Sequence, residues 1–188
     1  MKSRKEEILA AAAKCFRKNG YKATSMKSIA DEVGIQAASI YNHFASKQIL
    51  LQKLSMQMAN LFTDAMQDIK KSPLTNDQKL ERLIALHIQL TVAHTDAIAL
   101  VTGEWIHLEE AIKSDYLALR NTYENDFKAI LEAGKKEGTI KAANTTLLLY
   151  SLLSSLHWLY SWYSKNKDFN TIELEQQLTS LLLTGIRA

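Results

Sequence analysis

Turn-forming residues are scarce in this chain, which has only six glycines and one proline, Pro73, in 188 residues. A β-sandwich or barrel needs turn residues about every 8 to 12 positions, so this composition excludes those architectures. Hydrophobic residues make up 47% of the chain and charged residues 23%, which is the balance of an ordinary globular protein and not of a disordered one. The sequence therefore predicts an all-α fold.

Hydrophobic periodicity and capping residues divide the chain into about nine helices. The first is expected over residues 4–19, where a regular apolar stripe is followed by Asn19 and Gly20. Lone Cys15 lies on this stripe, where it is expected to pack as a small core residue. The other predicted helices cover residues 24–33, 37–44, 47–71, 76–90, 95–108, 114–134, 144–164 and 171–186.

Charge is unevenly distributed along the chain, although the formal net charge is only +3. Residues 1–50 contain nine Lys and Arg against four Asp and Glu, whereas the remaining residues contain 14 against 16. A basic head on a mildly acidic body is typical of a protein that binds a polyanion. The N-terminal run from Met1 to Lys5 is charged instead of apolar, and the single cysteine precludes an internal disulfide, so we expect a cytoplasmic protein.

Ala30, Gly34 and Ile40 have the spacing of a helix-turn-helix. The small residue lets the first helix approach the second, the glycine permits a sharp turn, and the branched residue fixes the second helix in place. Several polar positions are then left outward, where DNA would lie: Lys27, Gln36, Ser39 and Asn42.

The stretches F-x-x-x-G-Y-x-x-T-S-M-x-x-I-A, from Phe16, and I-Y-x-H-F-x-S-K, from Ile40, resemble the DNA-binding head of the TetR family. The resemblance covers roughly residues 4–54. It implies a ligand-responsive transcriptional regulator that is not an enzyme and holds no cofactor. It further implies a helix-turn-helix DNA-binding domain over residues 1–46 and a larger helical ligand-binding and dimerisation domain over residues 47–188. Repression relieved by a small effector is the expected mechanism.

The resemblance also implies which residues of the head contact double-stranded DNA. Phosphate contacts fall on residues near helix ends, namely Thr24, Ser25, Lys27, Tyr41, His43 and Lys47. Base contacts fall on Gln36, Ala37, Ala38, Tyr41 and Asn42, with Ser39 also outward, because amides pair with adenine and alanine methyls meet the thymine methyl. Relatives often carry Lys or Arg at position 37 and Gly at position 38, so an arginine contact to guanine is not expected here.

A head of this size binds DNA tightly only when it is doubled, so we expect a homodimer on a palindromic operator. Residues 147–163 and 174–186 are the expected dimer helices, because the first segment is apolar nearly all round and the second carries an apolar stripe. A membrane span is not expected. It would need about 20 unbroken apolar residues, whereas four serines and His157 interrupt the first segment.

The body resembles the acyl-CoA-responsive subgroup of the TetR family in the pattern Arg120-x-x-Tyr123-x-x-x-Phe127 and in Trp158-x-x-x-Trp162. His157 departs from this pattern, which usually holds Asn at that position. An acyl-CoA needs an apolar tunnel for its chain and cationic or aromatic groups for its nucleotide. The candidate ligand-binding residues are Trp105, Tyr116, Arg120, Tyr123, Trp158 and Trp162, each of which alternatively serves only in packing or on a solvated helix face.

Other features of the chain leave alternatives open. Glu104-x-x-His107 is one copy of the spacing found in di-iron bundles, which require a second copy that this chain lacks. A transition-metal effector site could be formed by His87, His94 and His107. The alternative is that these histidines are simply packed or solvated, and we expect no metal. The chain has no glycine-flanked serine motif for a nucleophile. The alternative to a regulator is a helical protein-interaction module whose head binds DNA without sequence preference.

Overall fold

The computed structural model describes residues 3–188, so Met1 and Lys2 of the charged N-terminal run lie outside the described residues. Over this range the structure is all-α, as predicted, with ten α-helices, one 3-10 turn and one isolated β-bridge. The chain forms two compact units: unit 1 is Met1–Asn60 with Asp96–Leu117, and unit 2 is Leu61–Thr95 with Ala118–Ala188. These units reflect packing, so the predicted functional boundary after residue 46 stays a prediction.

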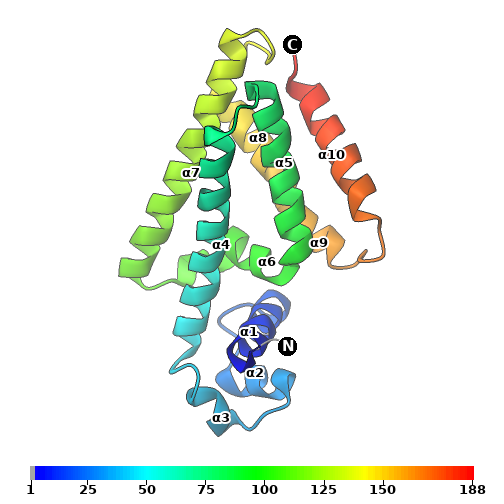
Figure 1. Cartoon of the computed structure of the whole chain (residues 1–188). Coiled ribbons are helices and arrows are strands. Elements are labelled where there is room, and N and C mark those ends of the chain that lie inside the picture. Colours follow the sequence, from blue (N-terminus) through cyan, green and yellow to red (C-terminus); the bar gives the residue numbers. More distant parts are fainter. Residues whose placement is uncertain (1–2) are drawn as a thin grey trace. The chain divides into compact units, whose positions relative to one another are not determined.

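Unit 1 begins with three helices: α1 (Arg4–Asn19), α2 (Met26–Val33) and α3 (Ala37–Tyr41) (Figure 1). α1 packs against α2, and α2 packs against α3. A capping box starts each of the first two helices, formed by Ser3 with Glu6 and by Ser25 with Ser28. The apolar stripes predicted from the sequence supply the fully buried residues of this head, which include Ile8, Ala12, Phe16, Ile29, Ala30 and Ile40.

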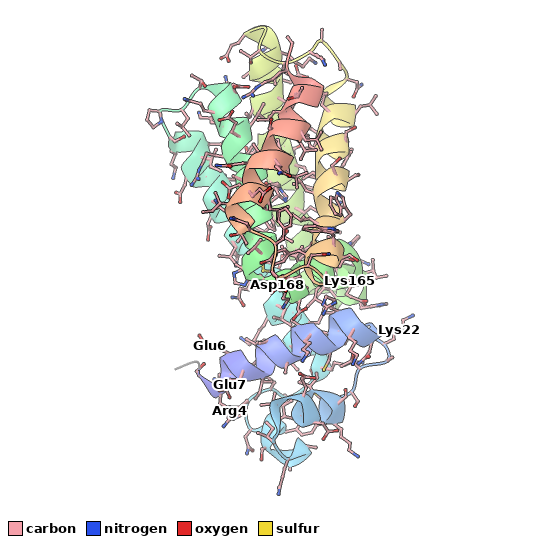
Figure 2. The ribbon with its side chains drawn as sticks, turned by 90° about the vertical axis from the view of Figure 1, so that its right-hand side faces the viewer. Arg4, Glu6, Glu7, Lys22, Lys165 and Asp168 are labelled. Atoms are coloured by element: carbon pink, nitrogen blue, oxygen red, sulfur yellow. The ribbon has the colours of Figure 1, made fainter. Side chains whose placement is uncertain are left out.

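The ends of α1 carry opposite charges. Figure 2 shows Arg4, Glu6 and Glu7 at the start of this helix and Lys22 beyond its other end. Glu6 and Glu7 lie in the first turn, and Arg17 lies in the last. Because a helix has a positive N-terminal and a negative C-terminal end, these carboxylates and this guanidinium stabilise α1.

The second stretch of unit 1 contains α6 (Thr95–Gly103), η1 (Glu104–His107) and the start of α7 (Glu110–Lys136), while α4 (Lys47–Lys71) begins in unit 1 and continues into unit 2. The sequence predicted one helix over residues 95–108. The structure ends the α-helix at Gly103, whose residue type has low helix propensity, and the chain continues as a single tighter turn. α7 begins at Glu110, before the predicted start at residue 114, with the acidic side chain in its first turn.

Unit 2 is a bundle of the second part of α4, α5 (Asn76–Ala93), most of α7, α8 (Thr145–His157), α9 (Leu159–Tyr163) and α10 (Thr171–Ile186) (Figure 1). α5 packs against α8, α9 and α10. The predicted helix over residues 144–164 is divided at Trp158, and Ser155 donates to the carbonyl of Ser151 at 2.8 Å just before the break, a back-bond that bends helices. The core is mostly aliphatic and includes Met66, Leu80, Leu83, Ile84, Phe127, Leu149 and Leu159.

The last residues of the chain close one end of unit 2. Arg187 donates to both carboxylate oxygens of Asp77, at 2.9 and 2.6 Å, and to Glu81 at 2.6 Å. Ala188 donates its backbone N–H to the carbonyl of Thr139 at 3.1 Å. The final turn of α10 is thus fastened to the start of α5.

In Figure 2, Lys165 and Asp168 mark the connection from α9 to α10.

No single helix among residues 3–188 is long and apolar enough to cross a membrane. The consecutive segments Asn76–Ala93 and Thr95–His107 satisfy length and composition only when the bent pair is counted together.

Gly34 is the position where the turn chemistry of the head is most easily tested. It follows α2 with a φ of +77°, and a Cβ placed there would meet no heavy atom within 4 Å. Gly34→Ala therefore adds backbone strain without a clash, and we expect the free energy of unfolding to fall by about 1 kcal/mol in urea denaturation followed by circular dichroism.

Gly103→Ala is the matched control, because a Cβ there also meets open space and φ lies outside the left-handed region. That change should leave stability unchanged or raise it, since alanine is the better helix former. Equal losses in the two variants would contradict the strain at Gly34.

Candidate nucleic-acid interface and ligand-binding residues

The contact between α2 and α3 has the predicted helix-turn-helix geometry. Ala30 and Ile40 are both fully buried, and Gly34 adopts the left-handed conformation that ends α2. The backbone N–H of Ile35 donates to the carbonyl of Ala30 at 3.0 Å, so the turn folds back onto the helix it leaves. The direction of α3 is therefore fixed by buried contacts.

The predicted base-contacting residues lie on and beside α3. This helix ends at Tyr41, short of the predicted end at residue 44, and a turn continues in which the N–H of Phe44 donates to the carbonyl of Ile40 at 3.0 Å. Together with Ser39, which was predicted to face outward, and His43, which was predicted to contact phosphate, four of these side chains are exposed and three are half-buried. The exposed ones are Gln36, Ala38, Tyr41 and Asn42, and the half-buried ones are Ala37, Ser39 and His43.

Ser25 and Lys27, predicted to contact phosphate, are exposed at the start of α2. The structure gives Thr24 a different place from the one predicted. Its side chain is only 2% exposed, and its hydroxyl donates to the carbonyl of Gly20 at 2.8 Å and lies 3.2 Å from that of Cys15. The Thr24 hydroxyl therefore stabilises the turn between α1 and α2 and does not reach outward.

Lys47 is also predicted to contact phosphate, but in the structure its ammonium binds backbone carbonyls of the same turn. Its ammonium donates to the carbonyls of Tyr21 and Thr24, each at 2.7 Å, and lies 4.3 Å from the centroid of the Tyr21 ring. A lysine has three N–H donors, and the carbonyl of Lys22 at 3.4 Å is a weaker third acceptor. Lys47 therefore orders the α1–α2 turn, a role that the sequence did not predict.

Two of the predicted ligand-binding residues meet in unit 1. The rings of Trp105 and Tyr116 stack, with centroids 6.1 Å apart and planes 21° from parallel. The Tyr116 side chain is buried, and its hydroxyl donates to the carbonyl of Val101 at 3.1 Å. The pair thereby connects η1 and α6 to the first part of α7.

Arg120, in unit 2, belongs to a polar network that the sequence predicts only in part. Its Nε donates to Glu124 at 2.8 Å, and the hydroxyl of Tyr150 donates to the other carboxylate oxygen at 2.8 Å. Glu124 is buried, so these two donors compensate its desolvation. The spacing of Arg120 and Glu124, four apart on one helix, was the available sequence signal; the contact to Tyr150, on α8, was not visible in the sequence.

Tyr123 lies in the core of unit 2. Its hydroxyl lies 2.8 Å from Nε2 of His87, and the ring of Phe62 packs against both side chains, at 5.7 and 4.7 Å between centroids. Burial lowers the pKa of His87 to about 3 and raises the pKa of the Tyr123 phenol. His87 is therefore a neutral, hydrogen-bonded core histidine at physiological pH.

The two predicted tryptophans of unit 2 form an edge-to-face pair. Trp158 is 48% exposed, and its ring centroid lies 6.1 Å from that of half-buried Trp162. Trp162 also contacts Phe169 at 5.4 Å. The six predicted ligand-binding residues thus divide, with Trp105 and Tyr116 in unit 1 and the other four in unit 2.

The histidines that raised the metal alternative have other contacts. His87 pairs with Tyr123, His94 follows α5 as its C-cap, and His107 stacks on Tyr21. Within the part of the chain that the structure describes, no group of three or more His, Cys, Asp or Glu side chains is arranged to hold a metal ion.

Both parts of the chain match models of known protein families. Residues 8–54 match the family model described as bacterial regulatory proteins, tetR family, and residues 73–186 match the model described as tetracyclin repressor-like, C-terminal domain. The chain is 28% identical over 185 residues to the HTH-type transcriptional repressor KstR2 of Rhodococcus jostii, an alignment that covers 97% of this chain and 91% of the relative.

Two solved structures share the fold. The ketosteroid transcriptional regulator KstR2 of Mycobacterium tuberculosis has a TM-score of 0.91 and 23% identity, over 100% of this chain and 97% of that one. The structure of AibR in complex with isovaleryl coenzyme A and operator DNA has a TM-score of 0.80 and 20% identity, over 96% of this chain and 98% of that one.

The buried neutral His87 makes stability depend on pH. The unfolded chain protonates this imidazole near its ordinary pKa of 6.5, whereas the folded state, with a pKa of about 3, keeps it neutral down to that pH. Its contribution is therefore present above pH 6.5 and lost as the pH falls. We expect the free energy of unfolding to decrease by up to about 1.4 kcal/mol per pH unit from this group, measured by urea denaturation between pH 7 and pH 4.

His87→Phe should remove this component of the pH dependence while preserving ring volume. Tyr123→Phe serves as the control: it retains the histidine and its pH dependence, although loss of the hydroxyl partner should lower stability at pH 7 by about 1–3 kcal/mol. An unchanged pH slope in His87→Phe would show that other groups cause the dependence.

Proposed function

Because the chain belongs to the TetR family of bacterial transcriptional regulators, which are DNA-binding proteins and not enzymes, we propose that it is a homodimeric repressor of a palindromic operator. A small hydrophobic or acyl-CoA-type effector releases it from the DNA. The observation that carries this proposal is the exposed row of Gln36, Ala38, Tyr41 and Asn42, held on a rigid turn by buried Ala30 and Ile40.

The chemistry of this row suits base contacts in the major groove. The amides of Gln36 and Asn42 match the donor and acceptor of adenine, and the methyl of Ala38 matches that of thymine. Gln36 precedes α3 without a side-chain capping bond, which leaves its amide available for DNA. Exposed Ser25 and Lys27 supply the neighbouring phosphate contacts. Residues 1–46 are the proposed DNA-binding domain and residues 47–188 the proposed ligand-binding and dimerisation domain.

Dimerisation is supported by the outer surfaces of α8 and α10, which pack against each other in unit 2. Leu147 on α8 is 69% exposed and Leu181 on α10 is 70% exposed. The exposed positions of α10 from Gln176 to Gly185 carry no charge. Exposed leucines on adjacent, uncharged helix surfaces are typical of an interface between protein chains.

The effector proposal is supported by the chemistry of the candidate residues and by the AibR structure, which holds isovaleryl coenzyme A. Exposed Trp158 offers a ring to a nucleotide base, and Arg120 offers a guanidinium beside the apolar core. An effector that binds better to the conformation unsuited to DNA must weaken operator binding by the same factor as DNA weakens effector binding.

Operator recognition predicts that two substitutions in the head will differ in their effects. We expect Gln36→Ala to weaken binding to an operator selected from randomised duplexes by about 1–3 kcal/mol, with little effect on scrambled DNA. Lys27→Ala should weaken binding to both and reduce the salt slope by about one. Fluorescence anisotropy at several salt concentrations, with and without isovaleryl coenzyme A, measures these effects.

Lys167→Ala, at an exposed lysine of unit 2, is the control and should bind both DNAs like the parent chain. Equal affinity of the parent for operator and scrambled DNA would instead support the helical interaction module with a non-specific head. Specific binding that isovaleryl coenzyme A leaves unchanged would reject this thioester as the effector.

The dimer proposal predicts that Leu181→Glu produces monomers. A carboxylate in the centre of an apolar interface loses its hydration without gaining a partner, so we expect at least a tenfold weaker association in sedimentation velocity, on the order of 1.4 kcal/mol or more. Ala10→Glu places the same group at an exposed position of α1 and should leave the association unchanged. A parent chain that sediments as a monomer would refute the homodimer.

A further inference from the structure

The turn between α1 and α2 donates a hydrogen bond to a side chain from a distant part of unit 1. The backbone N–H of Tyr21 donates to Oε2 of Glu104 at 3.2 Å, across 83 positions of sequence. The neighbouring N–H, that of Gly20, is satisfied within its own helix by the carbonyl of Phe16 at 2.8 Å. The carboxylate of Glu104 therefore serves a backbone donor that lies just past the end of α1.

The side chain of Tyr21 strengthens this connection. Its ring stacks on the imidazole of His107, with centroids 5.4 Å apart and planes 22° from parallel, and its hydroxyl donates to the side-chain oxygen of Gln48. Gln48 in turn donates to the backbone carbonyl of His107 at 3.1 Å. The three residues form a closed set of contacts between the head and η1.

The geometry of η1 explains why two of its residues act together. In a 3-10 turn, positions i and i+3 lie on the same side, so Glu104 and His107 both face Tyr21. Nε2 of His107 lies 3.6 Å from Oε2 of Glu104, and both side chains are about three-quarters buried. Trp105, in the same turn, stacks on Tyr116. A ligand that displaces Trp105 would therefore move Glu104 and His107 as well.

We propose that Glu104 and His107 form a latch on Tyr21 that orders the turn from Gly20 to Thr24 and thereby positions Ser25 and Lys27 for DNA. Lys47, on α4, donates hydrogen bonds to carbonyls of this turn, and Glu104, in η1, accepts a hydrogen bond from the N–H of Tyr21. Opening the latch means losing the contacts of Glu104 and His107 with Tyr21. A rearrangement of the segment from η1 to Tyr116 lowers DNA affinity through this step. The DNA consequence rests on the proposed function, whereas the latch itself does not.

The sign of the effect separates a latch from simple electrostatics. Removing a carboxylate from a basic DNA-binding head should strengthen DNA binding by charge alone. Loss of the latch should weaken it, because the turn that presents the phosphate-contacting residues becomes mobile. Glu104→Ala therefore distinguishes the two by the direction of the change.

Hydrogen exchange of the free protein tests the latch without DNA. We expect Glu104→Ala to exchange about tenfold faster in peptides that span residues 20–25, and to bind the selected operator about tenfold more weakly. Glu104→Gln retains an acceptor oxygen and should largely restore both. Glu110→Ala is the charge-matched control, because that side chain is 91% exposed, and it should leave the exchange unchanged.

A second pair of variants guards against a folding defect in Glu104→Ala. His107→Ala removes the stacking surface and should accelerate the same peptides, whereas His107→Phe preserves it and should not. Unchanged exchange in both Glu104→Ala and His107→Ala would overturn the latch. Faster exchange with equal or tighter operator binding would overturn its role in DNA affinity. A parent chain without operator specificity, together with faster exchange in Glu104→Ala, would refute the proposed function and leave the latch intact.

Discussion

The outward row that is proposed for base contacts depends on the contact of α2 with α3 around Gly34. The left-handed backbone at Gly34 turns the chain sharply enough for Ile40 to be buried with Ala30. With Ile40 inside, Tyr41 and Asn42 are outside. The surface proposed for base contacts thus arises from a packing requirement, since a five-residue helix has too few internal hydrogen bonds to fix its own direction.

The α1–α2 turn is ordered by side chains from two other segments, α4 and η1, and by one side chain of its own. Lys47 donates hydrogen bonds to its carbonyls, and Glu104 accepts one from the N–H of Tyr21. Within the turn, the hydroxyl of Thr24 donates to the carbonyl of Gly20. Short surface turns ordinarily leave such backbone groups to water. Here protein groups satisfy them, which makes the position of α2 sensitive to α4 and η1. In the proposed latch, this dependence links η1 to Ser25 and Lys27, the residues proposed to contact phosphate.

Unit 2 gives two of its buried ionisable side chains polar partners within an aliphatic core. His87 is matched by Tyr123, and Glu124 is matched by Arg120 and Tyr150. Because His87 and Glu124 both have partners, the bundle avoids the penalty of an unsatisfied buried ring nitrogen or carboxylate at these two points. The same groups would offer directional contacts to an effector with polar atoms, in surroundings that otherwise favour an apolar chain.

The sequence alone determined the helical class, the helix-turn-helix and the outward positions of Gln36 and Asn42, because these depend on composition, on periodicity and on turn residues a few positions apart. Ser39, expected outward, is half-buried. The break at Trp158 escaped it, since apolar periodicity continues through that segment. Only the tertiary structure decided that Thr24 and Lys47 hold a turn and that Glu104 meets Tyr21. The physical reason is that a hydrogen bond between residues tens of positions apart leaves no local pattern and exists only once the helices are packed.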